Sequence, residues 1–281
     1  MANILSLKRR IQVAINVSKT TRAMQMIAAS KLKKAQDAAL SSRPYVEKLT
    51  EVSINLVASV DKDNLHEYMK YNSSTSTLVI VILPDKGLVG SLVSNVLKEI
   101  INLQNKNVFY VALGKKAENF LAKTGRNVIA TFNFGTTLPS FDIVYPIIKI
   151  IDEQFLDGKV SEVRILSSKF QSIFSQKPQF TDLLPIKIPD VSKKEENMLF
   201  EPNAKTLLPT LLSHFLEMSV YQNILETYAS EQAARMIAMK NATDNAKDII
   251  DELKLEYNKG RQEKITNEIL DIAGATLALS N

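Results

Sequence analysis

The stretch "YASEQAARMIAMKNATDNAKDIIDELKLEY", from Tyr228 to Tyr257, decides the fold. It contains neither glycine nor proline, and small or apolar residues recur in it among charges of both signs. A heptad count that starts at Leu208 and runs through this stretch places no charged residue at positions a or d. The pattern predicts one long helix that forms half of a coiled coil.

The other half of the coiled coil is predicted at the amino-terminal end. A heptad count from Ile4 to Ala39 again keeps every charge off positions a and d, although this seam is narrow and partly polar. Pro44 predicts a kink, after which the helix can resume to about Ser59. The first helix enters the middle of the chain and the last one leaves it, so the two pair in antiparallel sense.

The last helix is the longer of the two, so its end is predicted to project beyond its partner. From Ile269 to Leu279 only Asp271 is charged, and the apolar residues cover more than one stripe of the helix. A helix end that is apolar on most sides is poorly soluble alone. We therefore expect a partner to surround it.

Between the two helices, apolar runs alternate with segments that can be helical. The runs "TLVIVIL", "NVFYVAL", "NVIATF" and "EVRILSS" lie between Thr77 and Lys205 and predict a mainly parallel sheet. The predicted fold class is α/β plus a long antiparallel α-helical coiled coil, with a central Rossmann-like domain. We expect a coiled-coil helix at 1–59, an α/β foot domain at 60–205, and a helix with an apolar tip at 206–281, capped by Thr206.

Charge and composition limit the function. The chain has 281 residues, a formal net charge of +5 and no cysteine, which excludes disulfides and thiolate metal sites. Residues 1–43 carry nine basic residues against one acidic residue, Asp37, and such an arm suggests nucleic acid, anionic lipid or the carboxylates of another protein as partner. The apolar runs are too short to cross a bilayer, so the protein is expected to be soluble or peripheral to a membrane.

No pattern predicts a catalytic, cofactor-binding or metal site. The turn Pro84–Leu92 has too few glycines for a phosphate loop, so a structural turn is favoured over a nucleotide site. The segment "DKDNLHE" from Asp61 departs from a calcium loop and is interpreted as a solvated linker. His66 and His214 lack catalytic companions, and His214 is expected at the surface.

Both ends of the chain resemble a known family. "TTRAMQMIAASKLKKAQ" (Thr20–Gln36), the segment Tyr228–Ala246 and "YNKGRQEKITNEILDIAGA" (Tyr257–Ala275) resemble the end signatures of the gamma subunit of rotary, F-type ATP synthases. The middle agrees more loosely, through "DKGLVGSL" and "KFQSIFSQKP". The resemblance implies a central rotor shaft without a catalytic site of its own.

The resemblance also implies partners and a location. The shaft would stand inside a hexamer of alpha and beta subunits, and the α/β domain would help form a foot with the epsilon subunit on the membrane c-ring. The protein would be peripheral, on the cytoplasmic face of a bacterial plasma membrane, and would couple proton or other ion transport to ATP synthesis. Because the signature begins near Met1, it leaves no room for a transit peptide.

Positions within the matched motifs imply a set of partner contacts. Some resemble places where the family's shaft touches beta subunits or couples its two helices, and the apolar tip would sit in a sleeve of the hexamer. The implied contacts are Lys8, Arg9, Met24, Arg235, Gln262, Thr266, Ile269, Ile272 and Leu277. From the heptad pattern alone, Met236 and Met239 are expected to fill the core of the seam. Arg235 and Lys240 are expected to lie on a solvated face of the helix.

Two other functions stay open at this point. A basic coiled-coil protein could bind nucleic acid through its first helix, which predicts binding to duplex DNA with an affinity that falls steeply with salt. An enzyme could use the Pro84–Leu92 turn, which predicts nucleotide binding by the isolated chain. Gly260, where the family usually has alanine, departs from the resemblance and should weaken the last helix by about 1 kcal/mol.

Overall fold

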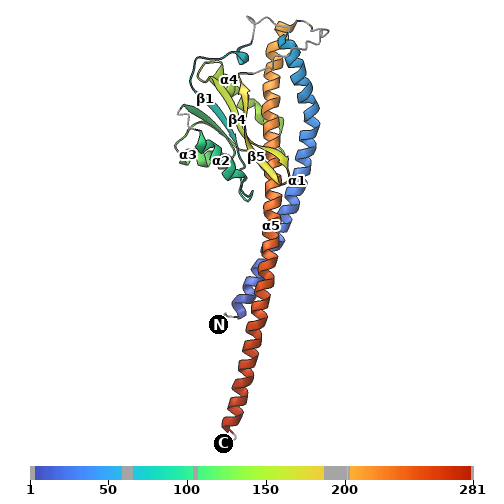
Figure 1. Ribbon diagram of the computed structural model, residues 1–281, viewed down its shortest axis with the longest axis vertical. Helices are drawn as coiled ribbons and strands as arrows, with labels where there is room; N and C mark the ends of the chain where they lie inside the picture. Colours follow the sequence, from blue (N-terminus) through green and yellow to red (C-terminus); the bar gives the residue numbers. More distant parts are fainter. Residues whose placement is uncertain (1–3, 59–65, 104–106, 187–200, 202, 280–281) are drawn as a thin grey trace. The chain divides into compact units, whose positions relative to one another are not determined.

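The computed structural model describes residues 4–58, 66–103, 107–186, 201 and 203–279. In chain order, its elements are α1 (Ile4–Ala58), the 3₁₀ helix η2 (Glu67–Met69), β1 (Thr77–Ile82), α2 (Leu92–Asn102), β2 (Val108–Leu113), α3 (Lys115–Lys123), β3 (Asn127–Phe132), the 3₁₀ helix η3 (Phe141–Ile143), α4 (Val144–Phe155), β4 (Glu162–Ser172), β5 (Ser175–Leu184) and α5 (Ala204–Leu279) (Figure 1). Long helices at both ends and a mostly parallel sheet between them confirm the predicted fold class.

The chain divides into two compact units. The helix-pair unit combines residues 4–27 of α1 with residues 236–279 of α5, and the sheet unit comprises the described residues from 28 to 235. Both long helices therefore contribute to both units. Each unit is described in turn.

In the helix-pair unit, α1 and α5 run antiparallel along the predicted seam. Thr21 bonds Thr243, and a Cβ atom added at Gly260 would lie 4.0 Å from the Ile4 side chain. Seventeen residues separate Ile4 from Thr21, and the same number separates Thr243 from Gly260, so the register is kept. The buried a and d positions are Leu7, Met239, Thr243, Ala246, Ile250 and Leu253. The heptad prediction is confirmed in this unit.

In the sheet unit, five strands lie in the order β3-β2-β1-β4-β5. The first four are parallel, and β5 runs antiparallel to β4. On the central strand, Ile80 pairs with Val111 on one side and Ile165 on the other, and all three are buried. Burial on both faces explains why these strands are continuous apolar runs in the sequence.

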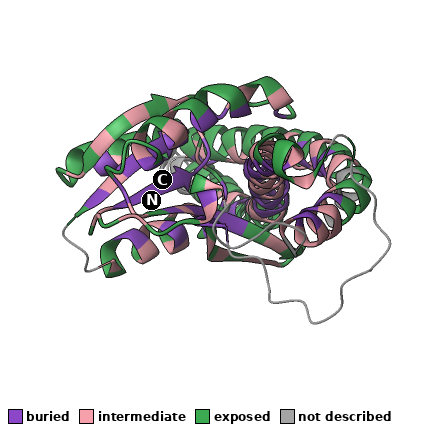
Figure 2. Ribbon diagram, turned by 90° about the horizontal axis from the view of Figure 1, so that it is seen from above, coloured by how far each residue is buried: buried purple, intermediate pink, exposed green. Residues whose placement is uncertain are grey.

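Helices cover both faces of this sheet. Val79, Val81 and Leu83 pack with α2 and α3 in one core cluster. The alternate residues of β1 face the other way, toward the side covered by α4 and the part of α5 that belongs to this unit. In Figure 2 the central strands of the sheet are largely buried and the outer sides of the covering helices are exposed.

Two local predictions need correction. β5 was not predicted, because its run holds Pro178 and only its last two residues are fully buried. The cap of α5 is Asn203, not Thr206, because the Asn203 carboxamide oxygen accepts the Thr206 N–H at 2.8 Å. Beyond Pro44, helix α1 continues to Ala58, which agrees with the predicted resumption to about Ser59. Residues 61–65 of the expected linker lie outside the described residues, and Glu67 begins η2.

Candidate functional site

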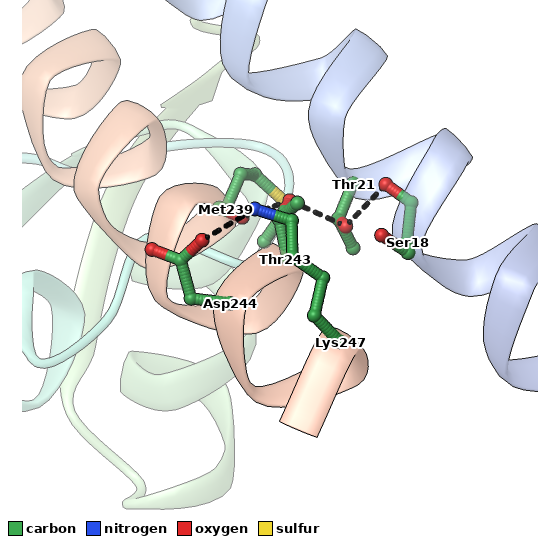
Figure 3. A network of polar contacts seen from close by, with 6 residues as sticks. All are labelled: Ser18, Thr21, Met239, Thr243, Asp244 and Lys247. Carbon is green, nitrogen blue, oxygen red and sulfur yellow. Dashed lines mark hydrogen bonds and ion pairs between the residues drawn. The ribbon is translucent and has the colours of Figure 1, made fainter. Parts of the chain in front are cut away.

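The seam of the helix-pair unit carries a hydroxyl pair at its polar middle. The Oγ1 atoms of Thr21 and Thr243 lie 2.7 Å apart, and Thr243 is 3% exposed (Figure 3). Thr243 also contacts the Met239 carbonyl oxygen at 2.8 Å, and Thr21 the Ser18 carbonyl oxygen at 3.1 Å. A buried polar contact at a seam fixes the alignment of two helices.

Beyond Ile4, α5 continues without α1 beside it in the described structure of this unit. A groove of about 670 Å³ lies where α1 begins, and Leu5, Gly260 and Glu263 are among its lining residues. From position 261 to 273 every α5 side chain is exposed. Ile269, Leu270 and Ile272 are 60%, 62% and 68% exposed, so the predicted apolar end is uncovered in the chain alone. Leu277 belongs to α5, but its side chain lies outside the described ones.

The outer face of α1 in this unit mixes cations with apolar residues. Lys8 and Arg9 are exposed, whereas Met24 is half-buried. The exposed apolar side chains are Leu5, Val13, Val17, Met26 and Ile27. On α5, Gln262 and Thr266 are exposed and lie one turn apart, with the Thr266 hydroxyl donating to the Gln262 carbonyl oxygen at 2.9 Å.

In the sheet unit, Asp85 joins the carboxyl ends of three neighbouring strands. It follows β1, and its carboxylate accepts the Lys115 N–H at 2.9 Å, the Phe134 N–H at 3.3 Å and the Gly135 N–H at 2.8 Å. Those amides follow β2 and β3. The turn after β1 therefore closes the edge at which open α/β sheets commonly bind ligands. Its left-handed residues, Leu88 and Gly90, fit the predicted structural turn.

Gly114 allows the chain segments that follow β1 and β2 to approach closely at the carboxyl edge of the sheet. Its φ is +102°, and an added Cβ atom would lie 1.8 Å from the Leu83 carbonyl oxygen. The Gly114 N–H donates to Phe132 at 2.7 Å, and Leu83 donates to Leu113 at 2.9 Å. Only glycine fits between the ends of these adjacent strands.

A buried ion pair on α5 meets the turn after β1. Arg235 Nη1 lies 2.6 Å from Glu231 Oε1, with side chains that are 14% and 5% exposed, and Arg235 Nη2 donates to the Gly87 carbonyl oxygen. Burial raises the pKa of Glu231 above its usual value, against the opposing effect of Arg235. Within the described residues, Glu231 Oε2 has no hydrogen-bond partner. The solvated-face interpretation of Arg235 is therefore wrong, whereas Lys240 is exposed.

Both histidines contact other polar groups. His214 is partly exposed, as expected for a residue at the surface, and contacts Tyr45 and Glu217. His66 precedes η2 and accepts a hydrogen bond from Tyr68. In the described part of the chain, no group of three or more histidine, aspartate or glutamate side chains is placed to hold a metal ion.

None of the helices in the described ranges is both long and apolar enough to cross a bilayer.

Comparison with known proteins identifies the family. A family model described as ATP synthase matches residues 3–279. The "ATP synthase gamma chain" of Dehalococcoides mccartyi is 44% identical over 287 residues and covers all of both chains, and that of Flavobacterium psychrophilum is 38% identical with 99% of both chains covered. The chain belongs to the ATP synthase gamma chain family.

Solved structures agree with this assignment at the level of the fold. A chain of the Euglena gracilis mitochondrial ATP synthase, from a structure of OSCP, F1 and the c-ring, matches with a TM-score of 0.72 at 17% identity, over 98% of this chain and 94% of that one. A chain from the central stalk and c-ring of the Tetrahymena thermophila mitochondrial enzyme matches with a TM-score of 0.59 at 23% identity, over 79% and 99%. The resemblance drawn from the two end motifs is confirmed, and the nucleic-acid-binding alternative finds no support in these matches.

Sequence reasoning missed several residues that connect separate elements of the fold. Asp85 could have been suspected, because it follows a buried strand directly and begins a turn. Glu231 and Arg235 stand four residues apart on a helix, a spacing that favours ion pairs. The partners of the hydroxyl pair, by contrast, are 222 residues apart and follow only from the register of the seam.

Proposed function

We propose that this chain is the central-stalk rotor subunit of an F-type ATP synthase. Its rotation would couple ion flow through a membrane ring to conformational change at catalytic sites carried by the alpha and beta subunits. The observation that carries the proposal is the end-to-end match to ATP synthase gamma chains, at 44% identity over both complete chains. The chain itself would supply no catalytic group and bind no cofactor.

The helix-pair unit supports the role of a shaft. Its seam is filled by small and apolar side chains, with Thr243 and Ala246 buried beside longer residues such as Ile250. A thin helix pair can turn inside a ring of subunits if no single contact is strong. At each angle of rotation the helix pair would contact the three catalytic sites with different energies. It would therefore favour a different conformation in each site, one after another as it turns.

Charge and apolar exposure support particular partner contacts. Lys8 and Arg9 are proposed to meet acidic loops of beta subunits, with Met24 beside them. Gln262 and Thr266 are proposed to contact the hexamer from the exposed side of α5. Ile269, Ile272 and Leu277 are proposed to turn within an apolar sleeve, since exposed apolar side chains gain from enclosure.

Arg235 takes a different place in this scheme. It is also a proposed contact, and its pairing with Glu231 would position the helix surface that the beta subunits meet. The Arg235 side chain would then meet the beta subunits while it stays paired with Glu231 of the same helix.

The sheet is proposed to act at the membrane side. Residues 60–205 would form the foot that joins the epsilon subunit and the c-ring, between shaft helices at 1–59 and 206–281. The protein would be peripheral to the membrane, on the cytoplasmic face of a bacterial plasma membrane, and protons or other ions would be the coupling species. The matched structures, one of F1 with the c-ring and one of the central stalk with the c-ring, support the c-ring as a partner.

Purification of the tagged chain from its own cells tests the proposal. Alpha, beta and epsilon subunits and the c-ring should co-purify, and membranes that contain the complex should show ATP-driven ion pumping. A matched preparation of the tagged chain that lacks residues 269–281 should recover fewer alpha and beta subunits. Recovery of duplex DNA, released by salt, in place of these subunits would overturn the proposal.

A further inference from the structure

The only two histidines of the chain, His66 and His214, lie in one polar cluster of the sheet unit. Tyr68 of η2 donates its hydroxyl proton to Asp152 of α4. Asp152 interacts electrostatically with His66 on one side and with Glu217 of α5 on the other. His214 Nδ1 lies 3.2 Å from Glu217 Oε2. Two imidazoles and two carboxylates from three elements are thus linked.

His66 caps η2 through a nitrogen that must be unprotonated. Its Nδ1 atom accepts the Tyr68 N–H at 3.2 Å, and its ring lies edge-on to the Tyr68 ring at 4.7 Å between centroids. A neutral imidazole can offer a lone pair at Nδ1, but a protonated one carries N–H on both nitrogens. A proton at this atom therefore turns the acceptor of the cap into a donor that faces another donor.

The capped residue joins two other parts of the sheet unit. Tyr68 is 4% exposed, and while its hydroxyl bonds α4, its carbonyl oxygen accepts the Ile186 N–H at 2.8 Å. Ile186 follows β5 by two residues. Loss of the cap would therefore loosen the connection between α4 and the segment that follows the edge strand.

The surroundings of His66 set the direction of its titration. Burial lowers its pKa below the usual value of 6.5, opposed by Glu67 beside it and Asp152 on α4 and aided by Lys70. The neutral form is thus favoured in the folded chain. The stability that the cap contributes is complete above the usual histidine pKa, and it is lost as pH falls toward the lower folded pKa.

The other titratable groups of the cluster act differently. Burial raises the pKa of Asp152, so this carboxyl favours the folded state at low pH and opposes the effect of His66 there. Glu217 of α5 interacts with Asp152 and lies 3.2 Å from His214 Nδ1, and the hydroxyl oxygen of Tyr45 of α1 lies 2.7 Å from His214 Nε2. The effect of His66 is therefore separated from that of Asp152 by variants at His66, which leave Asp152 in place.

We infer that His66 is an acid-sensitive latch: the neutral ring holds η2 and Tyr68 against α4 and the segment after β5, and a proton on Nδ1 releases them. The inference rests on the cap, the buried tyrosine and its two further hydrogen bonds. It does not depend on the proposed function. The latch would make one surface of the sheet unit respond to a fall in pH.

Hydrogen exchange of the full-length chain tests the latch. The protection factors of the Tyr68 and Ile186 amides, corrected for intrinsic exchange, are measured by NMR at about pH 7.5 and about pH 5.2, on either side of the histidine pKa. In the unaltered chain both should fall severalfold, because the opened form binds a proton at Nδ1 that the capped form excludes. His66→Asn keeps a capping oxygen that does not titrate, so protection should stay high at both pH values.

Two further variants complete the test. His66→Ala removes the cap, so protection should be low and independent of pH. His214→Gln keeps the cap but removes the other imidazole, and should behave like the unaltered chain. Equal protection at both pH values in the unaltered chain would overturn the inference, as would a fall that persists in His66→Asn or one that disappears in His214→Gln.

Discussion

The hydroxyl oxygens of Thr21 and Thr243 lie 2.7 Å apart across the seam between α1 and α5. Each hydroxyl also faces a carbonyl oxygen of its own helix, that of Ser18 or that of Met239. Two hydroxyl protons cannot fill three hydrogen bonds, so the proton chain runs either toward Ser18 or toward Met239. The hydroxyl groups thus form a chain of hydrogen bonds across the seam. The donors and acceptors of this chain can exchange roles without movement of the helices.

Replacement of these threonines by valine should show whether the link stabilises the pair. Thr21→Val or Thr243→Val alone should lower the free energy of unfolding by about 1 kcal/mol, because the remaining hydroxyl loses its partner across the seam. The double variant should lose less than the sum, because two apolar groups of similar shape then face each other. Urea unfolding followed by helical circular dichroism measures this cycle. Thr20→Val, at an exposed position, is the control, and strictly additive losses would contradict the prediction.

Arg235→Met should make the stability of the sheet unit depend on pH. Burial already raises the pKa of Glu231, and Arg235 is the main group that lowers it. Without Arg235 the pKa rises further, and a raised folded pKa gives stability that is present at low pH and lost as pH rises through that pKa. The loss should begin near the usual value of 4.5 and amount to about 1.4 kcal/mol for each unit of further rise.

Melting temperatures at several pH values measure this effect. The double variant Arg235→Met/Glu231→Gln is the matched control, because it has no carboxylate to titrate at this place. Its melting temperature should not show the decline with rising pH that Arg235→Met shows. A decline with pH in the double variant would assign the effect to another group.

Gly114→Ala should prevent the sheet unit from folding. The added methyl group would lie 1.8 Å from the Leu83 carbonyl oxygen, at a φ of +102°, and backbone on both sides of the contact leaves no room to relax. Gly87→Ala is the matched control, because its added methyl group would lie 4.0 Å from the end of the Lys116 side chain and its φ is not in the left-handed region. Soluble expression and amide NMR spectra compare them, and a folded Gly114→Ala protein would show that the strand ends can separate.

The heptad pattern predicted the long helices, and the apolar runs predicted the four parallel strands. Both kinds of pattern extend over a whole element, so neither depends on a single residue. In the helix-pair unit, the heptad count placed Ala246, Ile250 and Leu253 inside, and all are buried. The four apolar runs became β1 to β4. β1 is buried throughout and needs no polar alternation, whereas the residues of β3 alternate between exposed and half-buried. These predictions rested on the order of apolar and polar residues along a whole segment.

The parts that were missed depend on single contacts between distant residues. β5 pairs at the edge of the sheet, where half-exposed residues weaken the pattern. Arg235 was expected in solvent because its place beside the seam says nothing about the turn at Gly87, 148 residues away. The histidine cluster likewise joins η2, α4 and α5 through single side chains, and no periodicity reports such contacts.

Charge reversal at Lys8 and Arg9 should reduce coupling without unfolding the chain. Both side chains are exposed, so Lys8→Glu/Arg9→Glu should change the free energy of unfolding by less than about 0.5 kcal/mol. If acidic loops of beta subunits meet this face, ATP-driven ion pumping in membrane vesicles should fall more than ATP hydrolysis does. Lys98→Glu/Lys123→Glu makes the same change of charge at exposed positions of α2 and α3. Equal coupling in the two variants would remove Lys8 and Arg9 from the proposed contacts.

The apolar end of α5 should matter to the assembled complex and not to the fold of the chain. Ile269, Leu270 and Ile272 are 60%, 62% and 68% exposed, and full burial of such a side chain by a partner contributes about 1.5–3 kcal/mol. Serine at all three positions should therefore weaken assembly or torque, measured by subunit recovery and by ATP synthesis in vesicles.

Two comparisons separate enclosure of this end from a general effect of lost apolar surface. Leu255→Ser changes another side chain of α5 that is 72% exposed and should have a smaller effect, because it lies outside the proposed sleeve. Deletion of residues 269–281 should act at least as strongly as the triple serine variant, while the amide spectrum of the sheet unit stays unchanged. Since enclosure requires the side chains to be present, full coupled ATP synthesis by the deleted chain would refute the sleeve, even if the family assignment stood.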